Sequence, residues 1–195
     1  MFACAFDWPG WCRSGRDEDS ALAALREYLP RYAVAVGRAH VRKPSSDLEV
    51  VEHVRGSATT DFGAPGAIAD RDGEALSAAE LRRVVALVEA AWLVFDDVVA
   101  AAPAELQKGP RGGGRDRDKI VDHVYGAEVA YASRMGLKLR QPARGGTEAV
   151  AAFRAAVLDA LRSPVAGAKW PTRYAARRVA WHALDHAWEI EDRST

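Results

Sequence analysis

The chain is poor in cysteine, since only Cys4 and Cys12 occur among its 195 residues. Two cysteines without a second pair cannot form a thiolate metal cage, and reduced thiols in a cytoplasmic protein are the expected state. Long hydrophobic runs are also missing, because Arg, Asp or Glu interrupts every Ala-rich stretch. A transmembrane span is therefore excluded. The apolar start lacks basic residues and is broken by Asp7 and Pro9, so no signal peptide is expected.

An excess of charge of either sign is absent as well. The 27 basic and 27 acidic residues give a formal net charge of zero at pH 7. Binding to a phosphate backbone relies on a strong positive field, so nucleic acid is not expected as a partner. Hydrophobic residues at 49% and charged residues at 28% are ordinary for a globular domain, so disorder is not expected for the bulk of the chain.

The first part of the chain has the pattern of a small α+β unit. Strand-like segments at 2–6 and 11–14 flank a Pro-Gly turn, and an amphipathic helix fits 17–36. A short strand fits 48–54, although its alternation is imperfect. The stretch that follows is rich in Gly, Ala, Asp and Thr and has no apolar period, which indicates a linker.

The rest of the chain predicts four long helices. Ser77 and Glu80 form a capping box before the first, and Thr172 is expected to cap the last. Each helix carries one apolar stripe, and a four-helix bundle buries four such stripes against one another. The connection at 137–146 is long enough for a crossover loop but does not require one. The expected helices are 78–101, 116–135, 147–162 and 172 to near the chain end.

The predicted fold class is thus α+β, a small N-terminal α+β unit followed by an all-α four-helix bundle. The expected parts are the N-terminal unit, the linker and the bundle, at residues 1–56, 57–75 and 76–195.

Three histidines lie where the bundle would have its interior. His182 and His186 are four residues apart on the apolar stripe of the last helix, so their imidazoles can converge on one ion. His123 lies beside the stripe of the second helix. Three imidazole ligands are typical of catalytic zinc sites that keep one position open, and they also suit Ni, Cu or Fe. The alternative is three histidines that are hydrogen-bonded separately.

The angles of the other polar residues on these helices indicate their roles. Glu189 falls between His182 and His186 in angle, so it is the best candidate to orient an imidazole or to act as a base. Three other acids lie at the edges of the stripes and are expected in exposed salt bridges: Asp122, Glu128 and Asp185. Two histidines without a partner at ligand spacing are interpreted as structural or surface residues: His40 and His53. The Gly- and Arg-rich run at 111–119 lacks the phosphate-loop pattern and is interpreted as an interhelical loop.

Two segments carry a family resemblance. DKIVDHVYGAEVAYASRM and RYAARRVAWHALDHAWEIED resemble the second and last helices of the DinB-like superfamily, with ligands at His123, His182 and His186. The resemblance extends from about residue 77 to 194. It implies a four-helix bundle with a crossover between helices two and three, a divalent metal such as Zn or Ni, and often a homodimer. Characterised members include thiol-dependent S-transferases and a thiol-dependent isomerase, which implies a small-molecule substrate and a low-molecular-weight thiol.

The segment AFDWPGWCRSGRDEDSALAALREYLPRYA resembles the HicB-like antitoxin domain. The present chain starts at what would be the second strand of that domain, so the HicB-like part is truncated. Three functions follow from these observations. The first is an enzyme whose three-histidine metal acts as a Lewis acid on a thiol or water, of the S-transferase, isomerase or hydrolase type. The alternatives are a non-catalytic metal-stapled or HicB-like interaction module, and an antitoxin fragment.

Overall fold

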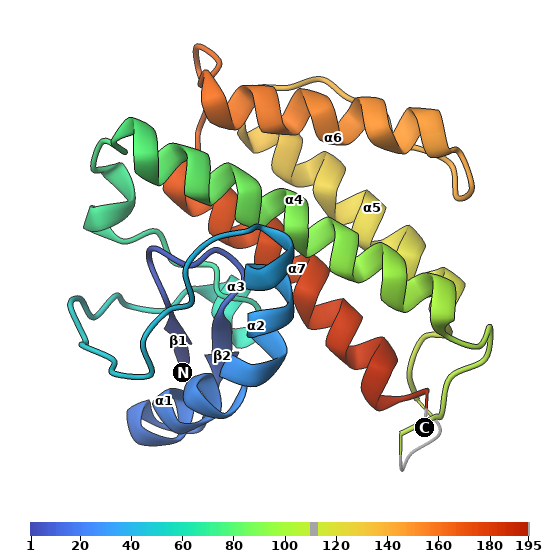
Figure 1. Ribbon diagram of the computed structural model, residues 1–195, viewed down its shortest axis with the longest axis horizontal. Coiled ribbons are helices and arrows are strands. Elements are labelled where there is room, and N and C mark those ends of the chain that lie inside the picture. Colours follow the sequence, from blue (N-terminus) through green and yellow to red (C-terminus); the bar gives the residue numbers. More distant parts are fainter. Residues whose placement is uncertain (110–112, 195) are drawn as a thin grey trace.

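The computed structural model describes residues 1–109 and 113–194. These residues are mostly helical with a two-stranded sheet near the N-terminus, so the broad α+β class is confirmed (Figure 1). Within the described ranges, no helix combines the length and apolar character that a membrane span requires. In chain order the elements are β1 Phe2–Cys4, β2 Cys12–Ser14, α1 Glu18–Glu27, α2 Leu29–Arg38, α3 Ala58–Asp61, η1 Asp70–Gly73, α4 Ala78–Ala101, α5 Arg117–Arg134, α6 Thr147–Arg162 and α7 Thr172–Asp192.

The four long helices begin and end within about one residue of their expected positions. Ser77 caps α4 as predicted: its side chain accepts from the Glu80 amide at 3.3 Å, and the Glu80 carboxylate accepts from the Ser77 amide at 2.8 Å. The cap expected at Thr172 is wrong, because Thr172 is the first residue of α7 and Pro171 holds the cap position. The expected interhelical loop covers 111–119, and its residues 111–112 lie outside the described residues.

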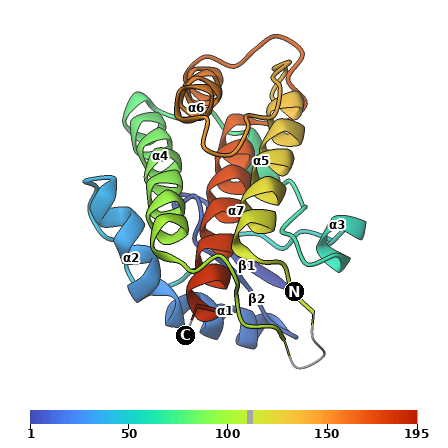
Figure 2. The same ribbon diagram turned by 90° about the vertical axis from the view of Figure 1, so that its right-hand side faces the viewer.

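Helix α7 lies between α4 and α5, and α6 runs at an angle to these three helices (Figure 2). Helix α7 packs against α4 along much of its length and also against α5. One contiguous core contains residues from both sides of the linker, such as Trp11 and Tyr32 with Val88 and Leu184. The arrangement makes α7 the most enclosed helix of the described chain. The division at residues 56 and 75 stays a prediction.

The N-terminal unit is fitted closely against α7. In the turn between β1 and β2, Gly10 has φ +94°, and a Cβ built there would lie 2.6 Å from Leu184 Cδ1. Only glycine satisfies both the positive φ and the close approach. Tyr32 donates its hydroxyl to the Pro9 carbonyl at 3.0 Å, and its ring stacks on Trp11 at 5.7 Å. The predicted Pro-Gly turn thus docks the sheet on the helices.

Two predictions for this unit are wrong. The single helix expected at 17–36 is divided at Tyr28 into α1 and α2, because Pro30 has no N–H to donate to the preceding turn. The strand expected at 48–54 does not form: all seven residues are described, and none pairs with another strand. Its Glu52 carboxylate instead accepts from the amides of Asp70 and Arg71.

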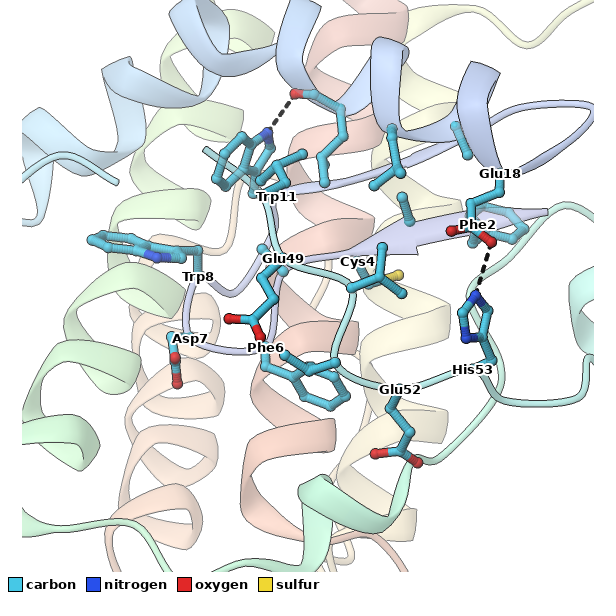
Figure 3. A pocket seen from close by; sticks show the side chains of 18 of the residues that line it. Phe2, Cys4, Phe6, Asp7, Trp8, Trp11, Glu18, Glu49, Glu52 and His53 are labelled. Atoms are coloured by element: carbon cyan, nitrogen blue, oxygen red, sulfur yellow. Dashed lines mark hydrogen bonds and ion pairs between the residues drawn. The ribbon is translucent and has the colours of Figure 1, made fainter. Parts of the chain in front are cut away.

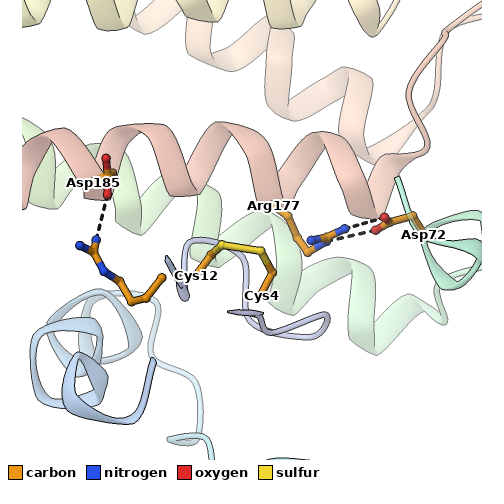
Figure 4. Close-up of a disulfide and its surroundings, with 6 residues drawn as sticks. Cys4, Cys12, Asp72, Arg177 and Asp185 are labelled. Atoms are coloured by element: carbon orange, nitrogen blue, oxygen red, sulfur yellow. Dashed lines mark hydrogen bonds and ion pairs between the residues drawn. A yellow bond between two sulfur atoms is a disulfide. The ribbon is translucent and has the colours of Figure 1, made fainter. Parts of the chain in front are cut away.

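The expectation of reduced thiols is also wrong for this structure. Cys4 and Cys12 are direct partners in the antiparallel register of β1 and β2, with their Cα atoms 4.1 Å apart, and they form a disulfide (Figure 4). Cross-strand neighbours are close enough for such a bond. Spacing in the sequence did not indicate it, because the pairing depends on how the turn at residues 5–11 is folded.

A buried ion pair joins the linker to α7. Arg177 donates from Nη2 and Nε to the two carboxylate oxygens of Asp72 in η1, at 2.5 and 3.1 Å (Figure 4). The Asp72 side chain is fully buried and that of Arg177 is 10% exposed. Because both charges are out of water, each depends on the other for compensation.

We expect Arg177→Met to lower the free energy of unfolding by about 3 to 5 kcal/mol, because it leaves the Asp72 carboxylate buried without its partner. Urea unfolding monitored by circular dichroism measures this loss. The matched control is Arg162→Met, which breaks the exposed Arg162–Asp159 pair and is expected to change stability by less than about 0.5 kcal/mol. Equal effects of the two substitutions would contradict a structural role for the buried pair.

Candidate metal centre

Three histidines come together between α5 and α7. The ring centroid of His123 lies 5.1 Å from that of His182 and 5.0 Å from that of His186, and the last two are 4.6 Å apart. One nitrogen of each ring lies within 4.8 Å of the others. Nitrogens bound to one zinc ion at about 2.0–2.1 Å would be about 3.4 Å apart, so small side-chain rotations suffice to close the cluster. The group could hold a metal ion.

The local sequence explains this convergence. His182 and His186 are one helical turn apart, so they project from one side of α7. Helix α5 packs against α7 and contributes His123 at the same level. Neither of the other histidines joins the cluster, as expected: His53 bonds Glu18 at 2.8 Å on the surface, and His40 follows α2.

Burial sets the protonation of the cluster. His182 is only 5% exposed, and its buried Nδ1 has no hydrogen-bond partner among the described residues. Burial, followed by the neighbouring His186 and His123, holds the pKa of His182 well below 6.5. Burial also lowers the pKa of His123. These two rings are therefore neutral at pH 7 with nitrogen lone pairs available, and a bound cation would satisfy the orphaned nitrogen.

Glu189 holds His186 in a defined orientation. Its Oε2 lies 2.7 Å from His186 Nδ1, and its Oε1 accepts from Arg193 Nη1 at 2.7 Å. The hydrogen bond with His186, helped by Arg193, lowers the pKa of the Glu189 carboxyl, so the group is an ionised acceptor. Because an ionised carboxylate only accepts, Nδ1 of His186 is the donor, and Nε2 is the ring nitrogen left to bind a metal ion. The 12% exposure of the His186 side chain leaves this arrangement largely shielded.

Two of the other candidate acids are in ion pairs, as expected, although only Asp122 is exposed and Asp185 is partly buried. Asp122 lies 3.0 Å from Arg144, and half of its side chain is exposed. Asp185 lies 2.8 Å from Arg13 of β2 (Figure 4). Neither carboxylate belongs to the histidine cluster. These acids connect α5 and α7 to neighbouring segments instead of completing the site.

Sequence reasoning missed Arg178, which lies beside the cluster. The residue is buried on α7, one turn before His182, and its Nη2 donates to the Tyr131 hydroxyl of α5 at 3.0 Å. The Tyr131 ring is 5.6 Å from the ring of His182. The available signal was a charged residue on the histidine stripe, because positions 178, 182 and 186 repeat at intervals of four.

A separate cavity of about 450 Å³ lies in the N-terminal unit (Figure 3). The extended segment 45–54 covers it, and the clustered histidines do not line it. The cavity and the candidate metal centre are therefore different places in the fold. Its lining combines aromatic rings with acidic side chains, including Phe2, Phe6, Trp8, Glu18, Glu49 and Glu52.

The expectation that Glu128 forms an exposed salt bridge is wrong. Its side chain is buried on the side of α5 that faces α4, where Oε1 accepts from Trp92 Nε1 at 2.6 Å. Burial raises the pKa of the carboxyl from 4.5 to about 7. The helical angle alone could not show that Glu128 would be buried and would accept from Trp92 of α4.

Glu128 therefore makes stability depend on pH. Between pH 4.5 and about 7 the folded chain retains a proton that the unfolded chain has released, so stability falls as pH rises through this window. The full loss is on the order of 3 kcal/mol. Glu128→Gln keeps an oxygen acceptor for Trp92 but does not titrate, so its advantage over the parent should grow across this window. Urea unfolding of both proteins from pH 4.5 to 8 measures it, and a constant difference would contradict the raised pKa.

Comparisons with known proteins assign no family to the chain. A scan against protein-family models, a search of curated proteins and a search of solved structures each found no match to the chain. The resemblances to the DinB-like superfamily and to the HicB-like domain therefore stay predictions. Conclusions on function rest on the geometry and chemistry of the three-histidine cluster.

Proposed function

We propose that the protein is a metal-dependent enzyme in which His123, His182 and His186 bind one divalent ion, zinc or nickel. The observation that carries this proposal is the convergence of three imidazoles around a buried nitrogen that has no partner in the described chain. Within the same residues the cluster includes no fourth His, Cys, Asp or Glu. Three protein ligands leave a position for water or substrate, as in catalytic zinc sites.

When bound, the ion would supply a Lewis acid that lowers the pKa of a thiol or water or polarises a carbonyl near neutral pH. The protein contributes the surroundings. His182 is shielded from water, whereas the partly exposed His123 leaves the cluster accessible from the α5 side. Glu189 is engaged by both His186 and Arg193, so we assign it to orienting His186 rather than to proton transfer.

The reaction class follows from the DinB-like resemblance. In this proposal the helices α4 to α7 form a DinB-like four-helix bundle with its crossover at residues 137–146, and the molecule is a cytoplasmic homodimer. The positions of the ligands on the second and fourth long helices support this assignment. The substrate would be a small molecule, with a low-molecular-weight thiol as the nucleophile in an S-transferase or isomerase, or water in a hydrolase.

We expect the protein, purified without a chelator or a histidine tag, to carry about one divalent ion per chain. His182→Ala and His186→Ala should each abolish tight binding, because two imidazoles hold an ion much less firmly than three. Elemental analysis and zinc titration measure both effects. His40→Ala and His53→Ala are the controls, since neither residue belongs to the cluster. Equal binding by all four variants would contradict the site.

Cobalt substitution of the same preparation separates an enzyme from a structural metal site. An open position allows 2-mercaptoethanol to bind the metal and to shift the cobalt absorption spectrum, whereas a site closed by a fourth protein ligand does not respond. An unchanged spectrum would favour the non-catalytic module in which the metal only joins α5 to α7.

The orienting role of Glu189 generates a separate prediction. We expect Glu189→Gln to weaken zinc affinity by about 10- to 100-fold, because it removes the charged acceptor that fixes the His186 ring. Competition with a chromophoric chelator measures the affinity. Asp159→Asn provides the control, since it removes an exposed carboxylate of α6 that pairs with Arg162, away from the cluster. Unchanged affinity in Glu189→Gln would show that the His186 orientation does not depend on Glu189.

A further inference from the structure

The buried arginines of α7 differ in one respect. Arg173 donates to the Asp7 carboxylate at 2.7 Å, and Arg177 donates to both oxygens of Asp72. Arg178 is only 5% exposed and forms no ion pair with any residue of the described chain. A buried charge without a counter-ion is unfavourable, and proteins compensate it where no ligand needs it. Arg178 is therefore the member of this set whose partner is missing.

Most of the hydrogen-bonding capacity of Arg178 is unused. Its Nη2 donates to the Tyr131 hydroxyl at 3.0 Å, but Nε and Nη1 are buried and have no partner within the described residues. The guanidinium lies 4.9 Å from the ring centroid of Trp181 and 5.2 Å from that of Tyr131. The two rings hold the cation in place without neutralising its charge. The three N–H donors of Nε and Nη1 thus have no acceptor among the described residues.

This guanidinium adjoins the histidine cluster. Arg178 precedes His182 by one turn of α7, which is about 6 Å along the helix axis. The rings that flank the guanidinium also flank His182, with centroids 5.6 Å away for Tyr131 and 5.8 Å away for Trp181. The carboxylates nearest in sequence have other partners, because Asp185 pairs with Arg13 and Glu189 bonds His186 and Arg193.

We propose that Arg178 and Tyr131 form a recognition site for a carboxylate group of the substrate, next to the three-histidine centre. This inference rests on the proposed function, because the bound group is a substrate only if the protein is an enzyme. A planar carboxylate matches the guanidinium fork and also accepts from a phenol hydroxyl. The substrate class is then a small organic acid whose carboxylate lies next to the three-histidine centre.

Isothermal titration of the full chain with succinate tests this site. We expect binding in both metal-free and zinc-loaded protein, and a dissociation constant about 10- to 100-fold weaker in Arg178→Gln. The neutral analogue succinamide should not bind. Arg162→Gln removes the same charge from the surface of α6 and should bind succinate like the parent. The metal-free arm shows that the carboxylate is recognised by the protein and not by the ion.

Two further variants keep the test decisive if Arg178→Gln folds poorly. Tyr131→Phe removes only the hydroxyl and should weaken succinate binding about three- to tenfold. Arg178→Met keeps aliphatic packing and removes the uncompensated charge, so its urea midpoint without succinate should equal or exceed that of the parent. Arg177→Met should lower the midpoint. A comparable loss in both methionine variants would identify Arg178 as a structural residue and overturn the proposal.

The outcomes separate this inference from the metal proposal. Normal zinc binding with no succinate binding, or with equal affinity in the parent and in Arg178→Gln, would overturn the carboxylate site alone. Binding that depends on Arg178 in a protein that takes up no metal would support the carboxylate site and overturn the metal centre. Inorganic phosphate is titrated in parallel, and tighter Arg178-dependent binding of phosphate than of succinate would contradict the carboxylate class.

Discussion

Helix α7 runs through the middle of the molecule with most of its side chains buried, including arginines and a histidine that water would otherwise solvate. Burying such groups is unfavourable unless each finds a partner, and this requirement organises the structure around the helix. Asp7 from the first turn pairs with Arg173, and Asp72 from the linker pairs with Arg177. Segments distant in sequence are thereby drawn onto one helix, and a single core forms across the linker.

The groups on α7 that lack a partner are as informative as those that have one. Besides Nε of Arg173, these are Nδ1 of His182 and two nitrogens of Arg178, which are buried and unsatisfied within the described chain. The atoms of His182 and Arg178 matter most for the site. They occur one turn apart on the same side of the helix, next to Tyr131 of α5. A cation at the histidines and an anion at the arginine would satisfy both groups. This complementarity links the proposed metal centre to the proposed carboxylate site.

Local rules were sufficient for much of the fold and for the histidine cluster. Helical period, the Ser77 capping box and the breaks at Gly and Pro predicted the long helices closely, because these signals act within a few residues. The four-residue interval between His182 and His186 already places both imidazoles on one helix face. The broad α+β class and the three candidate ligands therefore follow from the sequence alone.

Tertiary packing decided the features that depend on which segments meet. The disulfide between Cys4 and Cys12 depends on strand register, and the environment of Glu128 depends on how the helices pack around it, including Trp92 of α4. Position 178 carries a positive charge in the sequence, but only the packed structure shows that it is buried and that no described residue supplies its counter-ion. A residue's spacing determines its direction on a helix, whereas its solvation and its partners are set by distant parts of the chain that pack against it.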